Sequence, residues 1–196
     1  MSIGAGAGAL ARGRRASKGL VRPGVPWQSQ PMQMTPLMSL TSSSPDETAR
    51  IAARLGASLG VGDVVLLHGP LGAGKSHFAR ALIQSRLAEL GRVEDVPSPS
   101  FTLVQTYDLG NVALWHADLY RLGDPSETIE LGLDLAFDEA ISLVEWPERL
   151  GDLAPPDALH LYLEMGSAPE ARSLRFASEA PAWADRLARL TPPLGV

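Results

Sequence analysis

The sequence predicts an α/β fold in which helices pack against an open sheet. A short apolar run at 64–67 leads through a glycine-rich loop into a segment of helical character at 77–83. Two further apolar runs, at 112–117 and 141–146, each carry an acidic residue at or next to the end of the expected strand. Open α/β sheets hold ligands at the carboxyl ends of their strands, so this pattern predicts a site at one edge of the sheet.

The elements around the loop follow from local signals. Residues 44–48 (Ser-Pro-Asp-Glu-Thr) are typical of a helix start, and the apolar spacing at 49–56 suits an amphipathic helix. After the loop we expect a helix that runs to about Leu90 and ends at Gly91. The two prolines of 96–100 exclude a helix there, and the next strand is expected from Phe101 to Tyr107.

The loop itself, Gly69–Ser76, reads Gly-Pro-Leu-Gly-Ala-Gly-Lys-Ser and matches the GxxxxGK[ST] pattern of phosphate-binding loops. Lys75 is the only lysine after Lys18, which indicates a need for a compact charge that can reach the β- and γ-phosphates of a nucleotide. Backbone N–H groups and the helix dipole would surround the phosphates, and the Ser76 hydroxyl could bind Mg²⁺. The sequence therefore predicts a P-loop nucleotide site.

Two carboxylates are candidate metal ligands. Asp118 closes an apolar run in the manner of a Walker B element, and Glu145 repeats this pattern at the end of a later run. Each acid taken alone is equally consistent with a solvated strand end. Their shared order behind the loop favours a functional role for both.

Composition limits the functional classes. The chain has 196 residues and no cysteine, so disulfides, thiolate metal sites and cysteine nucleophiles are excluded. No apolar run approaches the roughly 18 residues of a membrane span, and we expect a soluble body without a membrane partner. Residues 46–196 hold all 22 acidic residues and 12 of the 17 basic ones, a net charge of −10. Such a body is poorly suited to binding nucleic acid directly.

We expect three regions along the chain: a disordered basic extension at 1–38, a P-loop domain at 39–180 and an unassigned tail at 181–196. The extension is arginine-rich and acid-poor like a transit peptide, but a start codon placed too far upstream explains it equally well. A GTPase would need a lysine after Lys75 for guanine recognition, and the chain has none. A small single-sheet ATPase or kinase remains.

The chain resembles the TsaE (YjeE) family of bacterial proteins, which are required for threonylcarbamoyladenosine (t6A) modification of tRNA. The resemblance covers roughly residues 40–178 and rests on motifs in a fixed order. They are Leu-Gly-Ala-Gly-Lys-Ser at 71–76, Ser-Pro-Ser-Phe-Thr-Leu-Val at 98–104, His-Ala-Asp-Leu-Tyr-Arg-Leu at 116–122, Glu-Leu-Gly-Leu at 130–133 and Val-Glu-Trp-Pro-Glu at 144–148.

The resemblance implies a small P-loop NTPase fold with a mainly parallel central sheet, flanking helices and antiparallel additions. The segments 158–163 and 173–177 would be late strands that could form a hairpin. The ligands would be ATP or ADP with Mg²⁺. Ser76, Glu145 and Asp118 would hold the metal, and Lys75, Asp118 and Glu145 would form the catalytic set. The implied nucleotide contacts are Gly69, Leu71, Gly72, Ala73, Gly74, Lys75, Ser76 and His77.

Further roles are implied for two short segments. Ser98, Pro99, Ser100 and Thr102 would form a switch-like loop that senses the γ-phosphate. Glu47 and Thr48 would contact the base or ribose, although a simple helix cap explains them at least as well.

Three histidines lie near the expected site. His68, His77 and His116 lack metal-ligand spacing, so we expect packing or polar contacts from them and no zinc site. Trp146 would pack beside the site.

The resemblance further implies an accessory ATPase in the cytoplasm, weak alone, that acts with the TsaD–TsaB pair while these partners hold the tRNA. Two alternatives remain at this stage. One is a small-molecule kinase in which Asp118 activates an acceptor hydroxyl. The other is a nucleotide-gated binding module without significant turnover.

Overall fold

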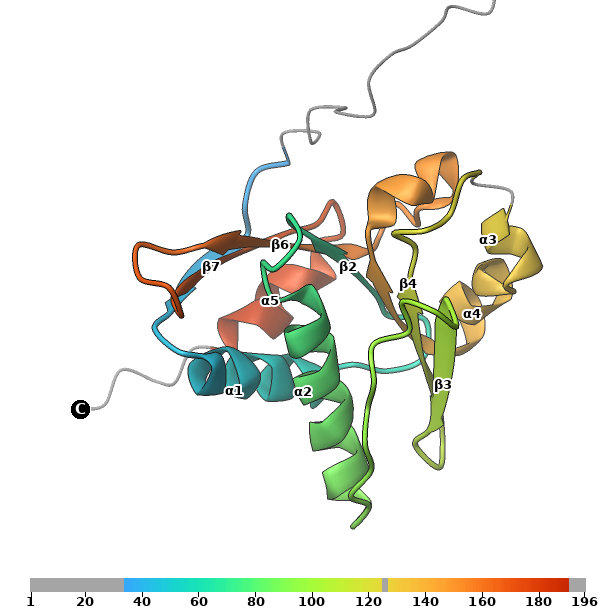
Figure 1. Cartoon of the computed structure of the whole chain (residues 1–196), viewed down its shortest axis with the longest axis horizontal. Coiled ribbons are helices and arrows are strands. Elements are labelled where there is room, and N and C mark those ends of the chain that lie inside the picture. Colours follow the sequence, from blue (N-terminus) through green and yellow to red (C-terminus); the bar gives the residue numbers. More distant parts are fainter. Residues whose placement is uncertain (1–33, 125–126, 191–196) are drawn as a thin grey trace, which may run out of the picture. The chain divides into compact units, whose positions relative to one another are not determined.

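The computed structural model describes residues 34–124 and 127–190, which belong to one compact unit (Figure 1). Most of the extension expected at 1–38 lies outside the described residues, as does the end of the chain from 191 onward. No helix in the described ranges is long and apolar enough to cross a membrane.

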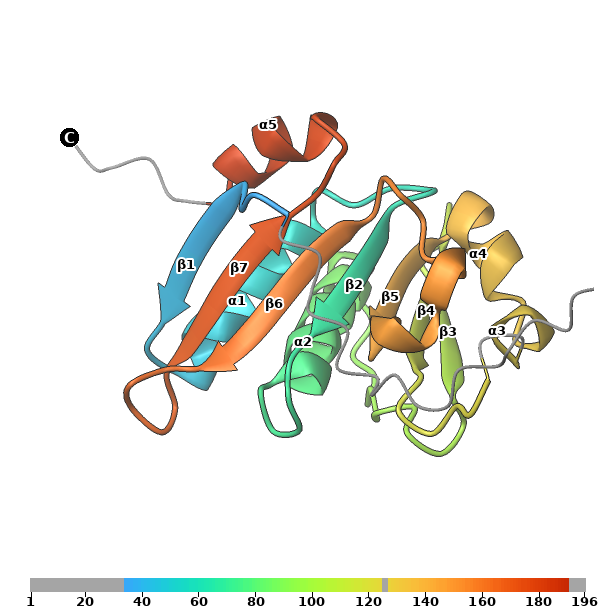
Figure 2. The same cartoon turned by 90° about the horizontal axis from the view of Figure 1, so that it is seen from above.

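A seven-stranded sheet with the order β1-β7-β6-β2-β5-β4-β3 forms the centre (Figure 2). The strands are β1 (Met38–Ser42), β2 (Val64–His68), β3 (Val104–Asp108), β4 (Ala113–Asp118), β5 (Ile141–Glu145), β6 (Leu159–Met165) and β7 (Arg172–Ala177). The middle strands β6, β2, β5 and β4 run parallel, whereas β7, β1 and β3 are antiparallel to their neighbours. This confirms the mainly parallel sheet with antiparallel additions and the β6–β7 hairpin.

Helices flank both faces of this sheet. The α-helices are α1 (Pro45–Gly56), α2 (Lys75–Glu89), α3 (Glu127–Glu130), α4 (Leu133–Glu139) and α5 (Ala182–Ala188), and two 3₁₀ turns are η1 (Pro147–Arg149) and η2 (Gly151–Leu153). Apolar residues of α1, α2 and α5 share one core cluster, and those of α4 belong to a second cluster with Leu150. Figure 2 shows α1 and α2 behind the sheet.

The two clusters explain the unbroken apolar run of β2. Val65 and Leu67 belong to the cluster under α1 and α2, while Val64 and Leu66 belong to the cluster under α4. Successive strand residues point to opposite faces, so a strand covered on both sides must be apolar at every position.

The helix ends follow the predicted signals. Ser44 caps α1, because its Oγ accepts a hydrogen bond from the Glu47 amide at 3.2 Å. Gly91 follows α2 with φ +70°, the left-handed conformation that a glycine C-terminal stop adopts.

Three features differ from the sequence-based expectation. β1 was not predicted, and it begins at Met38, which we had assigned to the extension. β3 begins at Val104 instead of Phe101, because the chain turns before it and Leu103 has φ +64°. The expected tail includes α5, whose Trp183 and Leu187 are buried in the larger cluster.

The α5 contact gives a testable prediction. Trp183 is 4% exposed, and its Nε1 donates to the Asp157 carbonyl at 2.8 Å. Trp183→Ala should lower the free energy of unfolding by about 3–5 kcal/mol in urea denaturation, since it leaves a cavity and an unpaired acceptor.

Leu135→Ala, on the exposed side of α4, is the control and should stay within about 0.5 kcal/mol of the wild type. If the two variants unfold alike, α5 does not contribute to the folded domain and the original boundary at 180 stands.

Candidate functional site

The Gly69–Ser76 loop connects the end of β2 to the start of α2. Gly69 and Gly74 have φ values of +142° and +105°, which side chains rarely allow. A Cβ atom at Gly69 would also collide with the backbone oxygen of Leu163 on β6. The tight passage of the loop over β6 therefore requires glycine at this position.

Lys75 is buried at the base of this loop. Its Nζ donates to the carbonyl oxygens of Gly69 and Pro70 at 2.7 and 3.0 Å and lies 3.8 Å from the centre of the Trp146 ring. Burial lowers the pKa of the Lys75 ammonium, and the carboxylates of Glu145, Glu148 and Asp118 partly offset that effect. The ammonium is thus held by the loop itself and by an aromatic face.

Glu145 lies at the end of β5, directly opposite Leu67 of β2 and Asp118 of β4. Its carboxylate is 1% exposed, and each oxygen has a partner. Oε2 accepts from Ser76 Oγ at 2.8 Å, and Oε1 lies 2.9 Å from His116 Nε2. Parallel pairing of three strands therefore brings this carboxylate beneath the first turn of α2.

Asp118 is also buried, but its partners come from a loop. Oδ2 accepts from Ser100 Oγ at 2.6 Å, and Oδ1 accepts from the Tyr120 amide at 3.1 Å. Ser100 Oγ is in turn 2.9 Å from Ser98 Oγ. The segment expected to act as a switch is thereby linked to the carboxylate at the end of β4.

These groups surround one pocket of about 280 Å³. It is lined by Leu71, Gly72, Gly74, Lys75, Ser76, His77, Ser100, Asp118, Tyr120, Glu145 and Trp146. The structure therefore places the three expected catalytic residues, the expected metal ligands and most of the loop in one site.

Some expected residues lie outside this lining. Gly69 and Ala73 of the loop, and Ser98, Pro99 and Thr102 of the expected switch, do not line the pocket. Thr102 is exposed.

Glu47 and Thr48 serve the start of α1. The Glu47 carboxylate accepts from the Ser43 amide and hydroxyl, both at 2.7 Å, and the Thr48 hydroxyl lies 2.5 Å from Ser42 Oγ. These contacts match the helix-cap interpretation. Their role toward a base or ribose stays a prediction, although His77 Nε2 lies 3.0 Å from the Pro45 carbonyl and so connects this helix start to the pocket.

Sequence reasoning missed two residues at the site. Tyr120 lines the pocket with its ring centre 4.8 Å from that of Trp146, and it lies inside a motif that could have signalled it. Arg172 of β7 donates from Nε to the Ala73 carbonyl at 2.9 Å, a support that no sequence pattern indicates. For His116 we expected packing or polar contacts, and its hydrogen bond to Glu145 is such a polar contact.

The oxygen-rich donor set fits Mg²⁺ better than a softer metal. Ser76, Glu145 and Asp118 provide hydroxyl and carboxylate oxygens around the pocket. The described residues contain no group of three or more His, Cys, Asp or Glu side chains that could hold a metal ion. A site with few protein ligands is typical of Mg²⁺ that also binds substrate phosphates.

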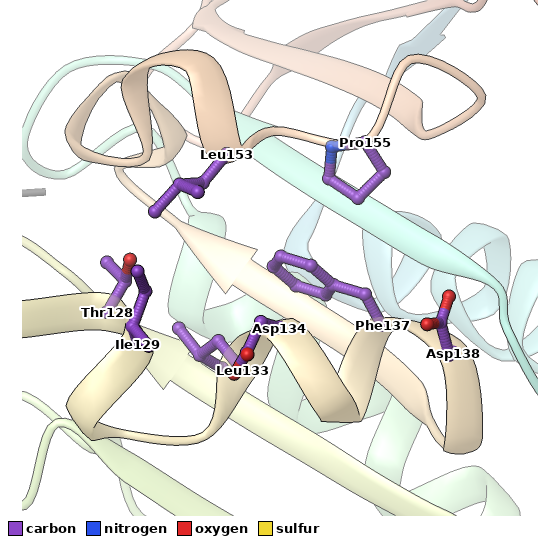
Figure 3. A pocket seen from close by; sticks show the side chains of 8 residues that line it. All are labelled: Thr128, Ile129, Leu133, Asp134, Phe137, Asp138, Leu153 and Pro155. Atoms are coloured by element: carbon purple, nitrogen blue, oxygen red, sulfur yellow. The ribbon is translucent and has the colours of Figure 1, made fainter. Parts of the chain in front are cut away.

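A second pocket, of about 210 Å³, lies apart from the loop (Figure 3). It is lined by Thr128, Ile129, Leu133, Asp134, Phe137, Asp138, Leu153 and Pro155. Most of these side chains are apolar, and none belongs to the Gly69–Ser76 loop. This second pocket therefore offers no basic side chain to a phosphate.

The strand, glycine-rich loop and helix, with Lys75 and Ser76 facing carboxylates at the ends of two parallel strands, define an α/β protein of the P-loop class. This fold suggests a nucleotide-binding role. The chain belongs to the TsaE family, because the sequence profile described as "Threonylcarbamoyl adenosine biosynthesis protein TsaE" matches residues 42–174. It therefore has a role in t6A biosynthesis.

Individual relatives agree with this assignment. The tRNA threonylcarbamoyladenosine biosynthesis protein TsaE of Rickettsia conorii is 40% identical over 124 residues, which cover 63% of this chain and 69% of that protein. The protein of the same name from Bacillus subtilis is 35% identical over 136 residues, or 69% and 82% of the two chains. The crystal structure of Bacillus subtilis YdiB superposes with a TM-score of 0.63 at 27% identity and covers 78% of this chain and 93% of that one.

The glycine requirement at the loop can be tested by substitution. Gly69→Ala should destabilise the protein by more than Gly110→Ala, because both glycines have positive φ but only Gly69 would place a Cβ against backbone. We expect about 1–2 kcal/mol for Gly110→Ala from conformational strain alone.

Urea denaturation measures the free energy of unfolding of both variants, and titration with a fluorescent ADP analogue measures their nucleotide affinity. Equal losses of stability for Gly69→Ala and Gly110→Ala would contradict the close passage of the loop over β6.

Proposed function

We propose that this protein is a Mg²⁺-dependent ATP-binding and ATP-hydrolysing accessory protein of tRNA t6A modification that acts with the TsaD–TsaB pair in the cytoplasm. The observation that carries the proposal is the convergence of Lys75, Ser76, Asp118 and Glu145 on one pocket at the end of the P-loop. An ammonium, a hydroxyl and two buried carboxylates are the groups that phosphoryl transfer with a metal requires.

Each group has a distinct part in this proposal. Lys75 and the amides of the loop hold the β- and γ-phosphates. Ser76 and Glu145, joined by Asp118, hold Mg²⁺, which when bound offsets the negative charge of the transferring phosphoryl group. Catalysis then depends on position and charge, and no covalent intermediate is needed.

Lys75 must exchange partners when nucleotide binds. Its Nζ donates to two loop carbonyls, and phosphate oxygens would replace these weaker acceptors. The Trp146 ring, whose centre is 3.8 Å from Nζ, covers one side of the ammonium. Because Lys75 is only 5% exposed, its attraction to a phosphate charge in the pocket is screened less than it would be at the surface.

The hydrogen bonds of Asp118 are consistent with a dependence of hydrolysis on a partner protein. Its carboxylate oxygens are engaged by Ser100 Oγ and by the Tyr120 amide. Oδ2 keeps a further lone pair that could orient water, and the Ser100 hydroxyl sets the position of this oxygen, so a movement of the segment that begins at Ser98 would change how the carboxylate meets water. A partner that moves this segment would therefore change turnover, which supports weak hydrolysis by the protein alone.

Two substitutions test the site. Lys75→Ala should abolish nucleotide binding, because it removes the only ammonium in the pocket lining. Glu145→Ala should retain some nucleotide but lose Mg²⁺-dependent hydrolysis by at least about 100-fold. Titration with fluorescent ADP and phosphate release measure these effects.

Arg92→Ala is a charge-matched control for Lys75→Ala, since Arg92 pairs with Glu94 away from the pocket and its loss should change neither quantity. Wild-type hydrolysis by Lys75→Ala would disprove the site assignment.

A test of the proposed role in t6A modification requires the partner proteins and the tRNA. We expect ATP hydrolysis by the purified protein to rise when TsaD, TsaB and tRNA are added, and this stimulation should be absent from Lys75→Ala. Transfer of phosphate to a small metabolite without stimulation would instead establish a kinase. Nucleotide affinity without turnover under any condition would establish a nucleotide-gated binding module.

A further inference from the structure

His116 is the most deeply buried polar side chain that contacts the proposed metal ligands. It is 0% exposed on β4, two residues before Asp118 and directly opposite Leu143 of β5. Because alternate strand residues share a face, the imidazole lies on the same face as Asp118 and reaches Glu145 diagonally. His116 is absent from the pocket lining, so it touches Glu145 from behind the site.

The hydrogen bonds divide the two oxygens of Glu145 between a buried side and a pocket side. Oε1 is 2.9 Å from His116 Nε2, while Oε2 accepts from Ser76 Oγ at 2.8 Å. A carboxylate that is ionised can only accept, so the imidazole must carry its proton on Nε2 for this contact to be a hydrogen bond. The donor fixes the rotation of the carboxylate about its last bond.

The other ring nitrogen, Nδ1, shows that a histidine at this position costs free energy of folding. Within the described part of the chain, His116 Nδ1 is buried and has no hydrogen-bond partner. An unsatisfied buried polar atom costs about 1–3 kcal/mol, and an apolar side chain of similar size would avoid that loss. Packing alone therefore does not account for a histidine here, whereas a requirement for a donor at the Nε2 position does.

We propose that His116 is a positioning residue that holds Glu145 in the orientation required to bind Mg²⁺. Its Nε2–H retains Oε1, so that Oε2 remains on the side of Ser76 and is available to the metal. The proposal rests on the proposed function, because it assigns His116 to the same site. It is consistent with the general behaviour of metal sites, in which a carboxylate ligand is itself held by a hydrogen bond.

Three substitutions distinguish positioning from packing. In His116→Gln the amide nitrogen can reach the position of Nε2, whereas in His116→Asn it reaches only the position of Nδ1. Gln also fills more of the space of histidine than Asn does, so His116→Met, which is similar to Gln in size but has no N–H donor, serves as the packing control. A positioning role predicts that Gln retains metal affinity and that Asn and Met lose it, whereas a packing role predicts that Gln and Met behave alike.

The readout is the affinity for Mn²⁺, which accepts the same oxygen ligands as Mg²⁺, measured by electron paramagnetic resonance in the presence of ADP. His116→Asn should weaken Mn²⁺ binding by about 10–100-fold, and His116→Gln should restore most of it. The affinity for ADP without metal should be unchanged in both. His160→Asn, on β6, is the control, since its ring contacts are His68 and Tyr162.

A second measurement needs no variant. ¹⁵N NMR of the wild type should show His116 with a proton on Nε2, and this Nε2 resonance should shift when Mg²⁺ and ADP are added. An Nε2 without a proton would overturn the proposal even if the Asn variant failed to fold.

The outcomes separate the two proposals. If the wild type binds neither ADP nor Mn²⁺ with ADP, the proposed function itself fails, and the positioning role fails with it. If the wild type binds both and His116→Asn binds Mn²⁺ equally well, only the role of His116 is refuted. Equal metal affinities in the Gln and Met variants would refute it too, because they would show that side-chain volume and not the N–H donor matters at this position.

Discussion

The parallel pairing of β5 with β2 and β4 is the constraint on which the site depends. It places Glu145 level with the end of β2, where the loop begins, and with Asp118 at the end of β4. A slip of one residue in this register would turn Glu145 to the opposite face of the sheet, away from α2. The apolar clusters on both faces resist such a slip, because every strand residue would then exchange its core partners.

The second constraint is that charged side chains are buried at the site, and the fold provides each of them with hydrogen-bond partners. Lys75, Asp118 and Glu145 are all at most 5% exposed, and each has hydrogen-bond partners within the site. Among the described residues other than glycine, only Leu103 and Trp146 have positive φ, and they immediately precede β3 and follow β5. Such conformations cost about 1–3 kcal/mol each and tend to occur at functional sites. Here Trp146 turns the chain where it lines the pocket, and Leu103 turns it between Ser100 and β3.

Local signals in the sequence were sufficient for the loop, the central strands and both carboxylates, because each is a contiguous pattern. β1 could not be predicted in this way: its inward apolar residues are only Met38 and Leu40, and its partner β7 is far along the chain. The contact of Arg172 with the loop also depends on pairing between distant strands. His116 lay inside a motif, yet its bond to Glu145 follows only from the register of β4 and β5.

The two carboxylates differ in what holds them, and this difference suits different tasks. Glu145 is held by His116, which is rigidly placed within the sheet, and by Ser76 in the first turn of α2. Asp118 is held by Ser100, whose neighbour Phe101 is 85% exposed. A ligand that changes the hydrogen bonds of Asp118 would therefore move the exposed segment around Ser100, while Glu145 would keep its position. In the proposed function, a static metal site and a movable carboxylate would let the bound nucleotide change the surface that a partner meets.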